Sequence, residues 1–291
     1  MKIIADTNVW YYLSNKNNKK LNNLLKKVGT LCSTPISFLE IVSKINEGNF
    51  EKRKGVAEAL IEKSQEYLPN SEIFLKQSWG FDCHDELDWK QGYGILAEAQ
   101  NYQGLINGYV DLEDLMVKKL NIPLAKLWRD YKYNQFYDDI AKAINTLIPN
   151  YIKKINSAGK IPKIKDATKL SLFNEQNFID TIIKTTWHRL TLYNGNTPEI
   201  KGKLTDGKFQ KAKHKLSPYA KAYAEYLKYL CEFGAKPEGN DAGDLECFLY
   251  LRDKDYIIAT AETRWIKIGN KACPGQILDI KSFIKDSASM F

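Results

Sequence analysis

Both ends of the chain repeat one pattern, in which a short apolar run leads into a polar turn and then into residues with helical spacing. Four of these apolar runs are short enough to predict buried strands, at residues 2–5, 31–33, 256–259 and 276–280. Apolar residues at helical spacing lie between them, at 21–28, 37–45, 56–67, 240–253 and 260–267. Because strands that alternate with helices pair in parallel, the chain ends predict an α/β fold whose sheet is flanked by helices.

The middle of the chain has a different pattern, because residues from about 90 to 230 are mainly helical in spacing and rich in Tyr and Trp. Helices are predicted there at 124–137, 140–155, 178–192 and 218–233, with lysine-rich loops at 159–169 and 195–215. We therefore expect one discontinuous α/β domain built from residues 1–68 and 235–291. A mainly α-helical insertion with basic loops, residues 69–234, would interrupt it.

Composition limits the setting and the partner of the protein. The formal net charge is +8 and the isoelectric point about 9.0, which suits a nucleic-acid partner and equally suits a soluble, lysine-rich protein. The five cysteines include no C-x-x-C pair, which indicates reduced thiols rather than a zinc knuckle or a disulfide framework. No run approaches about 18 apolar residues, so we expect a cytoplasmic protein without a membrane span.

Acidic side chains are candidates for chemistry because they follow strands or open helices. Asp6 comes directly after the first predicted strand, and Glu262 closely follows another. Glu40 lies in the first turn of one helix, and Asp241 and Asp244 lie three positions apart at the start of another. In a parallel sheet the carboxyl ends of strands share one edge, where α/β proteins bind their ligands. We expect these carboxylates to meet there.

Carboxylates that crowd together repel one another, and they stay ionised only when a cation neutralises them. Oxygen ligands alone favour hard divalent ions such as Mg²⁺ or Mn²⁺. Such an ion activates water and stabilises the charge that develops on a phosphodiester. An acidic metal site on a basic protein therefore indicates a nuclease.

Each acid also has a structural explanation of its own. Asp6 suits the N-cap of the helix that follows it. The pattern Ser37-x-x-Glu40 is that of a capping box, in which the glutamate reaches back to the N-cap amide. Asp241 and Asp244 suit the positive end of a helix dipole, and Glu262 suits a solvated loop. These explanations account for the residues singly, but not for all of them falling at one predicted edge.

The order and placement of these residues resemble the motifs of the PIN-domain nuclease family. Residues 6–9, Asp-Thr-Asn-Val after an apolar strand, resemble the opening of that domain. Ser37-x-x-Glu40 before an apolar run resembles its second motif. Asp244, with Thr260 sixteen positions later and then Glu262, resembles its third and fourth motifs. The resemblance covers both ends of the chain and not its middle.

The resemblance implies a PIN-like, Rossmann-like sheet flanked by helices and a site of three or four acids that binds Mg²⁺ or Mn²⁺. It implies that Asp6, Glu40 and Asp244 are catalytic metal ligands. Glu262 matches the fourth acid, which is usually aspartate in the family, and Asp241 would complete or tune the site. The matching polar residues that would support the site are Thr7, Asn8, Ser37 and Thr260.

The resemblance also implies cleavage of RNA, single-stranded or structured, by a toxin with an antitoxin protein partner or by an RNA-processing enzyme. The stretch between Glu40 and Asp244 is much longer than a small PIN toxin carries, which leaves the substrate class and the toxin identity open. A homodimer is a further alternative that the sequence leaves open.

A basic segment in the predicted insertion is a candidate contact with nucleic acid. Residues 201–215 hold one acid, Asp206, and two side chains that can stack on bases, Phe209 and His214. A flexible solvated loop explains the same composition. The lysines of the segment are Lys201, Lys203, Lys208, Lys211, Lys213 and Lys215.

The expected function is that of a metal-dependent endoribonuclease. One alternative is a non-catalytic RNA-binding PIN-like module with a degenerate metal site, for which the glutamate at position 262 is the support. The other is a 5′-nuclease-like enzyme acting on DNA, a class that resembles PIN domains but usually carries more acids.

Overall fold

The computed structural model describes residues 1–15, 19–43, 45–81, 83, 89–111, 122–153, 155, 159–192 and 206–289. Within these residues, five strands form one sheet in which every neighbouring pair is parallel. They are β1 (Lys2–Ala5), β2 (Thr30–Ser33), β3 (Glu66–Tyr67), β4 (Tyr256–Thr260) and β5 (Ile277–Asp279), in the order β3-β2-β1-β4-β5. The predicted α/β fold with a parallel sheet flanked by helices is confirmed, and it is compatible with a Rossmann-like arrangement.

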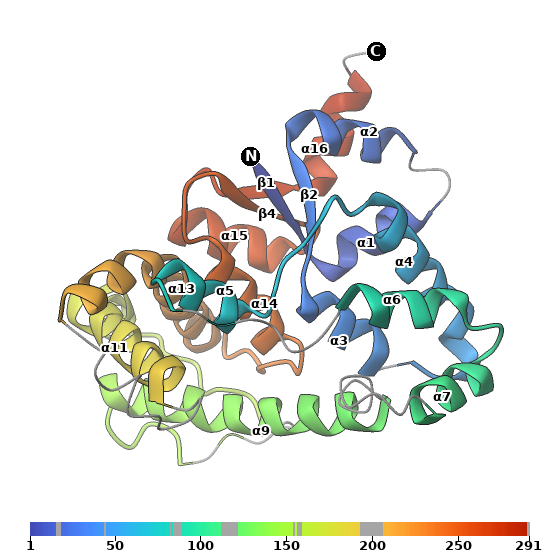
Figure 1. The fold of residues 1–291 in the computed structure, drawn as a ribbon. Coiled ribbons are helices and arrows are strands. Elements are labelled where there is room, and N and C mark those ends of the chain that lie inside the picture. Colours follow the sequence, from blue (N-terminus) through green and yellow to red (C-terminus); the bar gives the residue numbers. More distant parts are fainter. Residues whose placement is uncertain are drawn as a thin grey trace.

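Helices connect the strands and fill the middle of the chain (Figure 1). The first part contains α1 (Thr7–Ser14), α2 (Lys19–Val28), α3 (Pro35–Ser43), η2 (Glu47–Asn49) and α4 (Phe50–Lys63). The middle contains α5 (Ser71–Ser78), α6 (Trp89–Glu98), α7 (Tyr102–Asp111), α9 (Ile122–Leu147), α10 (Ala167–Ser171), η3 (Leu172–Asn174), α11 (Gln176–Leu192) and α13 (Asp206–Phe233). The last part contains α14 (Asp241–Cys247), η4 (Phe248–Tyr250), α15 (Thr263–Ala272) and α16 (Ile280–Ser289). Among the described helices, none has an apolar stretch long enough to cross a lipid bilayer.

Both faces of the sheet are buried, as near-continuous apolar strands require. Ile3 is in register with Leu31 and Ile257, and these side chains belong to one hydrophobic core. Ile4, which points to the opposite face, belongs to the other core. The alternation along β1 therefore separates two cores rather than a core and a solvent face.

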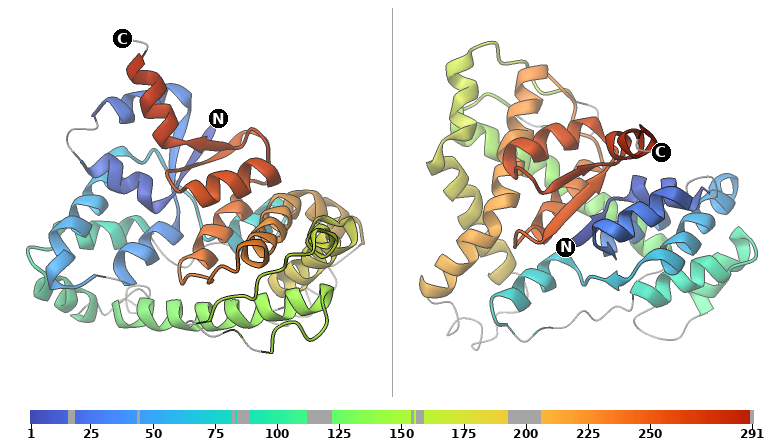
Figure 2. Two further views of the ribbon diagram at one scale, coloured as in Figure 1. Left: turned by 180° about the vertical axis from the view of Figure 1, so that it is seen from behind. Right: turned by 90° about the horizontal axis from the view of Figure 1, so that it is seen from above.

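Helices from distant parts of the sequence cover each face (Figures 1 and 2). The face of Ile3 packs against α1 to α4 and also against α6, α7 and α16. The face of Ile4 packs against α5, α9, α11 and α13 to α15. Residues 69–234 therefore add helices to both cores of the sheet, and the boundaries between domain and insertion stay a prediction.

Three segment predictions are wrong in part. The helix expected over 56–67 ends at Lys63, and Glu66 and Tyr67 form β3, which pairs with β2. The helices expected at 124–137 and 140–155 form one helix, α9, which ends at Leu147. The loop expected at 195–215 is helical from Asp206 onward. Each error lies where tertiary packing sets an element boundary that local spacing does not mark.

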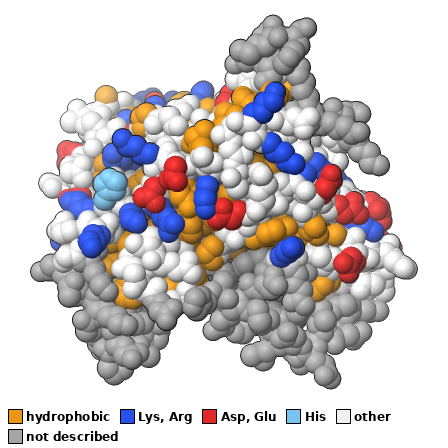
Figure 3. Space-filling view, turned by 45° about the horizontal axis from the view of Figure 1, so that its top comes forward, with side chains coloured by type: hydrophobic (Ala, Val, Ile, Leu, Met, Phe, Trp, Pro, Cys, Tyr) orange, Lys and Arg blue, Asp and Glu red, His pale blue; other side chains and the backbone are white. Residues whose placement is uncertain are grey.

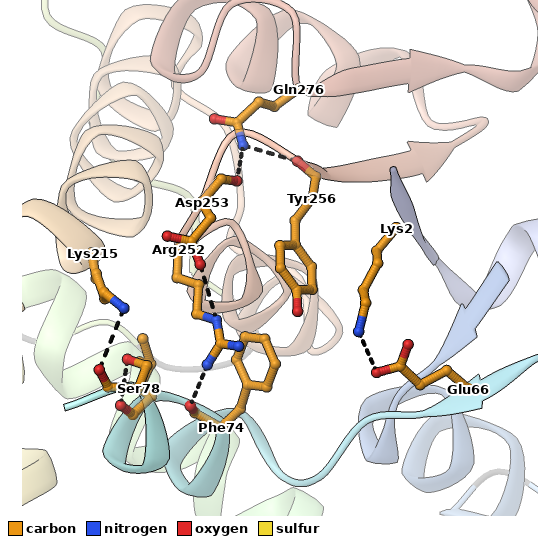
Figure 4. A network of polar contacts seen from close by, with 10 residues as sticks. Lys2, Glu66, Phe74, Ser78, Lys215, Arg252, Asp253, Tyr256 and Gln276 are labelled. Atoms are coloured by element: carbon orange, nitrogen blue, oxygen red, sulfur yellow. Dashed lines mark hydrogen bonds and ion pairs between the residues drawn. The ribbon is translucent and has the colours of Figure 1, made fainter. Parts of the chain in front are cut away.

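Polar contacts near the start of β4 join the middle of the chain to its end (Figure 4). Arg252 donates to the carbonyl oxygen of Phe74 at 3.1 Å, and its guanidinium carbon lies 3.8 Å from the centre of that ring. Nζ of Lys215 in α13 donates to the carbonyl oxygen of Ser78 in α5 at 3.3 Å. These contacts fix α5 between the sheet and the helices of the middle segment.

A close backbone approach fixes the start of β2. A β-carbon at Gly29 would lie 2.1 Å from the carbonyl oxygen of Met1, which accepts the N–H of Thr30 at 2.9 Å. A side chain at Gly29 must therefore displace the first contact between β1 and β2. Gly55, inside α4, has no atom within 4 Å of the corresponding position.

Gly29→Ala is expected to lower the free energy of unfolding by about 1–3 kcal/mol, the usual effect of forcing atoms into a filled space. Gly55→Ala is the matched control and should raise that free energy by about 0.5–1 kcal/mol, because alanine favours a helix interior. Urea unfolding followed by circular dichroism measures both changes. Equal effects of the two substitutions would contradict the close approach at Gly29.

Candidate functional site

The candidate site lies where the strand order reverses. β1 lies between β2 and β4, so the chain adds β2 and β3 on one side and later returns to add β4 and β5 on the other. Asp6 directly follows β1, and Glu262 lies two residues beyond β4. The N–H of Asp6 donates to the carbonyl oxygen of Ala259 at 3.1 Å, which ties the two strand ends together. Open parallel sheets bind ligands outside the carboxyl ends of their strands at such a reversal.

Asp6 is buried, and its carboxylate is held by polar neighbours on both strand ends. Oγ1 of Thr260 donates to Oδ2 of Asp6 at 2.8 Å, and Nδ2 of Asn8 donates to the same oxygen. Asn8 also accepts the N–H of Ala261 at 2.9 Å. Burial raises the pKa of Asp6 to about 6; the bonds from Thr260 and Asn8 oppose that rise, and repulsion from Glu262 adds to it. Asp6 does occupy the N-cap position of α1, but its side chain makes no capping hydrogen bond there and points to the end of β4.

Asp244 is buried in α14, where Nε1 of Trp265 donates to its Oδ2 at 2.7 Å. Burial raises the pKa of Asp244 well above its usual range, and repulsion from other carboxylates raises it further. These carboxylates belong to Asp6, Glu40, Glu262 and Asp241. The acids predicted to meet, although they come from opposite ends of the sequence, therefore lie within electrostatic reach of Asp244.

Glu40 reaches the same place from α3. This helix begins at Pro35, so Ser37 lies inside it and donates to the carbonyl oxygen of Ala5 at 3.5 Å. The capping-box explanation is therefore wrong. A β-carbon at Gly243 would lie 3.2 Å from Oε1 of Glu40, so the glycine lets α14 pass directly against this carboxylate.

Asp241 has a different environment from the other acids. It is fully buried and forms an ion pair with Arg264 through Oδ1. Its Oδ2 accepts the hydroxyl of Tyr226 at 2.5 Å and the N–H of Glu238 at 2.8 Å. Burial raises the pKa of Asp241, and Arg264 opposes that rise. Both carboxylate oxygens of Asp241 are therefore engaged by other groups of the protein.

Sequence reasoning missed three side chains that surround the acids. The rings of Tyr226 and Trp265 stack with centres 5.4 Å apart and planes inclined by 21°. The thiol of Cys247 lies among the same acids, since burial and repulsion from nearby carboxylates including Asp6 raise its pKa well above the usual range. Trp265 offered a signal because it follows Glu262 by three positions, whereas Tyr226 lies in the middle of the chain and offered none.

Buried hydroxyl groups without hydrogen-bond partners gather at the same edge of the sheet. They belong to Thr7 beside Asp6, and to Ser33 and Thr34 at the end of β2, and they find no partner among the described residues. An unsatisfied buried polar group is unfavourable, and a water molecule, an ion or a ligand can satisfy it. Of the predicted supporting residues, Asn8 and Thr260 hold Asp6, and Thr7 supplies one of these hydroxyls.

We call Asp6, Glu40, Asp244 and Glu262 the acid group, and its all-oxygen donors suit a hard divalent cation. Neither Asp6 nor Asp244 forms an ion pair with any residue that the structure describes. Within the same residues, no three His, Cys, Asp or Glu side chains lie close enough together to hold a metal ion. The fit to a cation therefore rests on charge and donor type. Mutual repulsion opposes closer approach of the carboxylates, and a cation between them would remove it.

The predicted basic segment falls partly outside the described residues. Lys201 and Lys203 lie outside them, and so does the side chain of Lys208. Lys211 is an exposed residue of α13, as is His214. Among its described residues, the segment therefore offers one exposed lysine, Lys211, and one exposed ring, His214, and both lie on a helix and not on a loop.

Three members of the basic segment contact other parts of the protein. Lys213 forms an ion pair with Asp180 at 2.7 Å, and Lys215 is bonded to α5 as described above. Phe209 packs edge-on against Trp187 with ring centres 5.9 Å apart, which makes it a packing residue and not an open platform for a base. On the face shown in Figure 3, Lys and Arg lie interspersed with Asp and Glu and do not form one basic patch.

Comparisons of the chain with protein-family models, with curated proteins and with solved structures give no match. The chemistry of the site therefore depends on the residues at the sheet edge and on their surroundings.

Arg264→Gln is expected to lower the free energy of unfolding by about 3–5 kcal/mol, because it leaves the Asp241 carboxylate buried without its cation. Adding Asp241→Asn removes that charge and should recover most of the loss. Urea unfolding of the parent, both single variants and the double variant forms a double-mutant cycle. Strictly additive losses would mean that the two side chains do not stabilise each other.

Proposed function

We propose that this protein is a Mg²⁺- or Mn²⁺-dependent endoribonuclease of the PIN-domain type. The observation that carries the proposal is the position of the acid group at the reversal point of a parallel sheet, where its members lie within electrostatic reach of Asp244 and two of its carboxylates are buried. Buried like charges destabilise a fold, so a purely structural role does not account for them. Titratable groups perturbed by burial and by one another are typical of functional sites.

The residues of the site divide into ligands and the groups that orient them. Asp6, which follows the end of β1, and Asp244, in the first turn of α14, would bind the cation. Thr260 and Asn8 fix the carboxylate of Asp6, and Trp265 fixes that of Asp244. A bound Mg²⁺ or Mn²⁺ supplies an activated water molecule and stabilises the negative charge that develops on a phosphodiester.

The two glutamates occupy the borders of the acid group. Glu40 is partly buried between α3 and α14, where Arg53 lies near enough for the two charges to interact. Glu262 is exposed beyond β4 and is the acid most open to solvent and to a long substrate. We propose that Glu40 completes the ligand set and that Glu262 assists from its solvent side.

RNA is the proposed substrate because the charge of +8 favours a polyanion and because the motifs at both chain ends resemble those of ribonucleases. The exposed cations of α13 are candidates for phosphate contacts. DNA with a flap or a branch is the substrate that a 5′-nuclease would prefer, and a parallel assay on single-stranded RNA and flap DNA separates the two enzymes.

A non-catalytic RNA-binding module is the second candidate. It is favoured by one observation, the lack among the described residues of three acidic, His or Cys side chains close enough to hold a metal ion. This candidate retains RNA binding without binding a divalent cation.

Asp6→Asn and Asp244→Asn are each expected to reduce Mn²⁺-dependent cleavage of single-stranded RNA at least about 100-fold, because a catalytic metal is worth several kcal/mol of transition-state stabilisation. Both variants should fold, since each removes a buried charge and keeps the shape of the side chain. The measurement is kcat/KM on a fluorescent oligoribonucleotide, with circular dichroism as the check on folding.

Asp255→Asn is the matched control, since Asp255 is exposed just before β4, at the opposite edge of the sheet from the acid group. Its cleavage rate should stay within about twofold of the parent rate, as for most surface changes. Full activity of folded Asp6→Asn or Asp244→Asn would refute the proposed enzyme.

Calorimetric titration with Mn²⁺ tests the metal independently of catalysis. The parent protein is expected to bind Mn²⁺, and Asp6→Asn should weaken binding at least about tenfold through the loss of a charged ligand. Salt-sensitive RNA binding by a parent protein that takes up no Mn²⁺ would favour the non-catalytic module.

A further inference from the structure

A cavity of about 450 Å³ lies among α9, α11 and α13, in the helical middle of the chain. This volume falls within the range of about 300–1,000 Å³ that is usual for sites of small organic ligands. The cavity is formed entirely by residues that the structure describes, and none of them belongs to the acid group.

Aromatic side chains form much of the cavity wall. Phe136 of α9, Phe178 of α11 and two tyrosines of α13, Tyr219 and Tyr223, line it. The two tyrosine rings lie nearly parallel, with planes inclined by 6° and centres 6.1 Å apart. Such walls favour a flat aromatic ligand, which can stack on one ring and meet others edge-on.

Charged and polar groups face the same space. Asp139 and Arg189 line the cavity, and Nε of Arg189 is buried without a hydrogen-bond partner among the described residues. Burial raises the pKa of Asp139. Lys142 and His188 also line the cavity, and threonine hydroxyls complete the lining. The cavity thus offers both hydrogen-bond donors and acceptors to one ligand.

The charges around Arg189 are balanced, which limits the choice of ligand. Burial acts to lower its pKa, but the neighbouring groups Tyr219, Glu246, Glu72 and Asp139 raise it. A free inorganic anion would meet these acids and leave most of the space unfilled. A purely apolar ligand would leave Nε of Arg189 buried without a partner.

The cavity wall is connected to the acid group by stacked rings. Phe136 stacks on Tyr226 with ring centres 6.0 Å apart and planes inclined by 24°, and Tyr226 stacks on Trp265. Tyr226 donates to Asp241, and Trp265 donates to Asp244. A ligand that contacts Phe136 in the cavity is therefore linked by two ring contacts to Trp265, which donates to Asp244.

We propose that this cavity binds a nucleobase, supplied either by an unpaired nucleotide of the RNA substrate or by a free nucleotide. A base is flat and aromatic, and its edge carries both donors and acceptors, which matches the walls and the polar groups. The part of this inference that concerns substrate RNA rests on the proposed nuclease function. The base-binding chemistry itself does not.

The test is calorimetric titration of the full chain in EDTA, which prevents cleavage, with AMP, GMP, CMP and UMP and with a single-stranded oligoribonucleotide. Thr185→Phe places a ring in the cavity from an exposed position that lines it. Lys184→Phe is the matched control. Lys184 is the neighbour of Thr185 in the sequence and is also exposed, but it does not line the cavity. Thermal unfolding verifies that both variants fold.

Thr185→Phe is expected to weaken binding of at least one of these probes about tenfold or more, the loss of one stacked base, whereas Lys184→Phe should not. Asp139→Asn should change the order of preference among the four bases. Asp138→Asn is the control and should leave that order unchanged, because Asp138 is exposed and does not line the cavity.

Loss of mononucleotide binding identifies a free nucleotide as an occupant, and loss confined to the oligoribonucleotide identifies a base of the substrate. Unchanged affinity of Thr185→Phe for every probe overturns the inference, even if the protein cleaves RNA. If the parent protein cleaves no RNA but Thr185→Phe still weakens base binding, the assignment of the cavity holds and the proposed nuclease function is refuted.

Discussion

The repulsion among buried carboxylates at the edge of the sheet is the constraint around which the rest of this structure is arranged. Burial and the neighbouring acids raise the pKa of Asp244 together, and burial raises that of Asp6. A fold tolerates such a group only where surrounding contacts hold it in place. The bonds from Thr260 to Asp6 and from Trp265 to Asp244 do so, and they come from the last residue of β4 and from the first turn of α15. Both buried carboxylates are thus held by donors from one part of the chain, the end of β4 and the start of α15.

A comparison within α14 shows that this arrangement is selective. Asp241 and Asp244 lie in the same short helix, and both are buried. Asp241 has an arginine partner and two further donors, while the described residues give Asp244 a single indole donor and several repelling acids. A helix dipole acts on both residues alike and cannot explain this difference. The difference lies in the partners of the two carboxylates: both oxygens of Asp241 are engaged by donors, whereas Asp244 lies among acids that repel it.

The sequence predicted those parts of the molecule that follow from local pattern and from parallel pairing. Apolar runs marked β1 and β4, and the parallel rule then brought Asp6 and Glu262 to one edge. β3 escaped prediction because its two residues have no apolar alternation and are fixed by pairing with β2. The partnership of Asp241 with Tyr226 was equally hidden, because nothing in α13 indicates which face of the sheet it covers. The spacing of apolar residues predicts the helices and strands, whereas packing between helices decides which acid is paired with an arginine.

The helical middle of the chain contributes directly to the site through that packing. α9 contacts both α3 and α14, the helices that carry Glu40 and Asp244, and in Figure 1 it runs below them across the molecule. Its Phe136 is at once a wall of the cavity and the outer ring of the stack that ends at Trp265. The wall of the cavity and the contacts that hold Asp241 and Asp244 are therefore joined by one continuous set of ring contacts from the middle of the chain to its end.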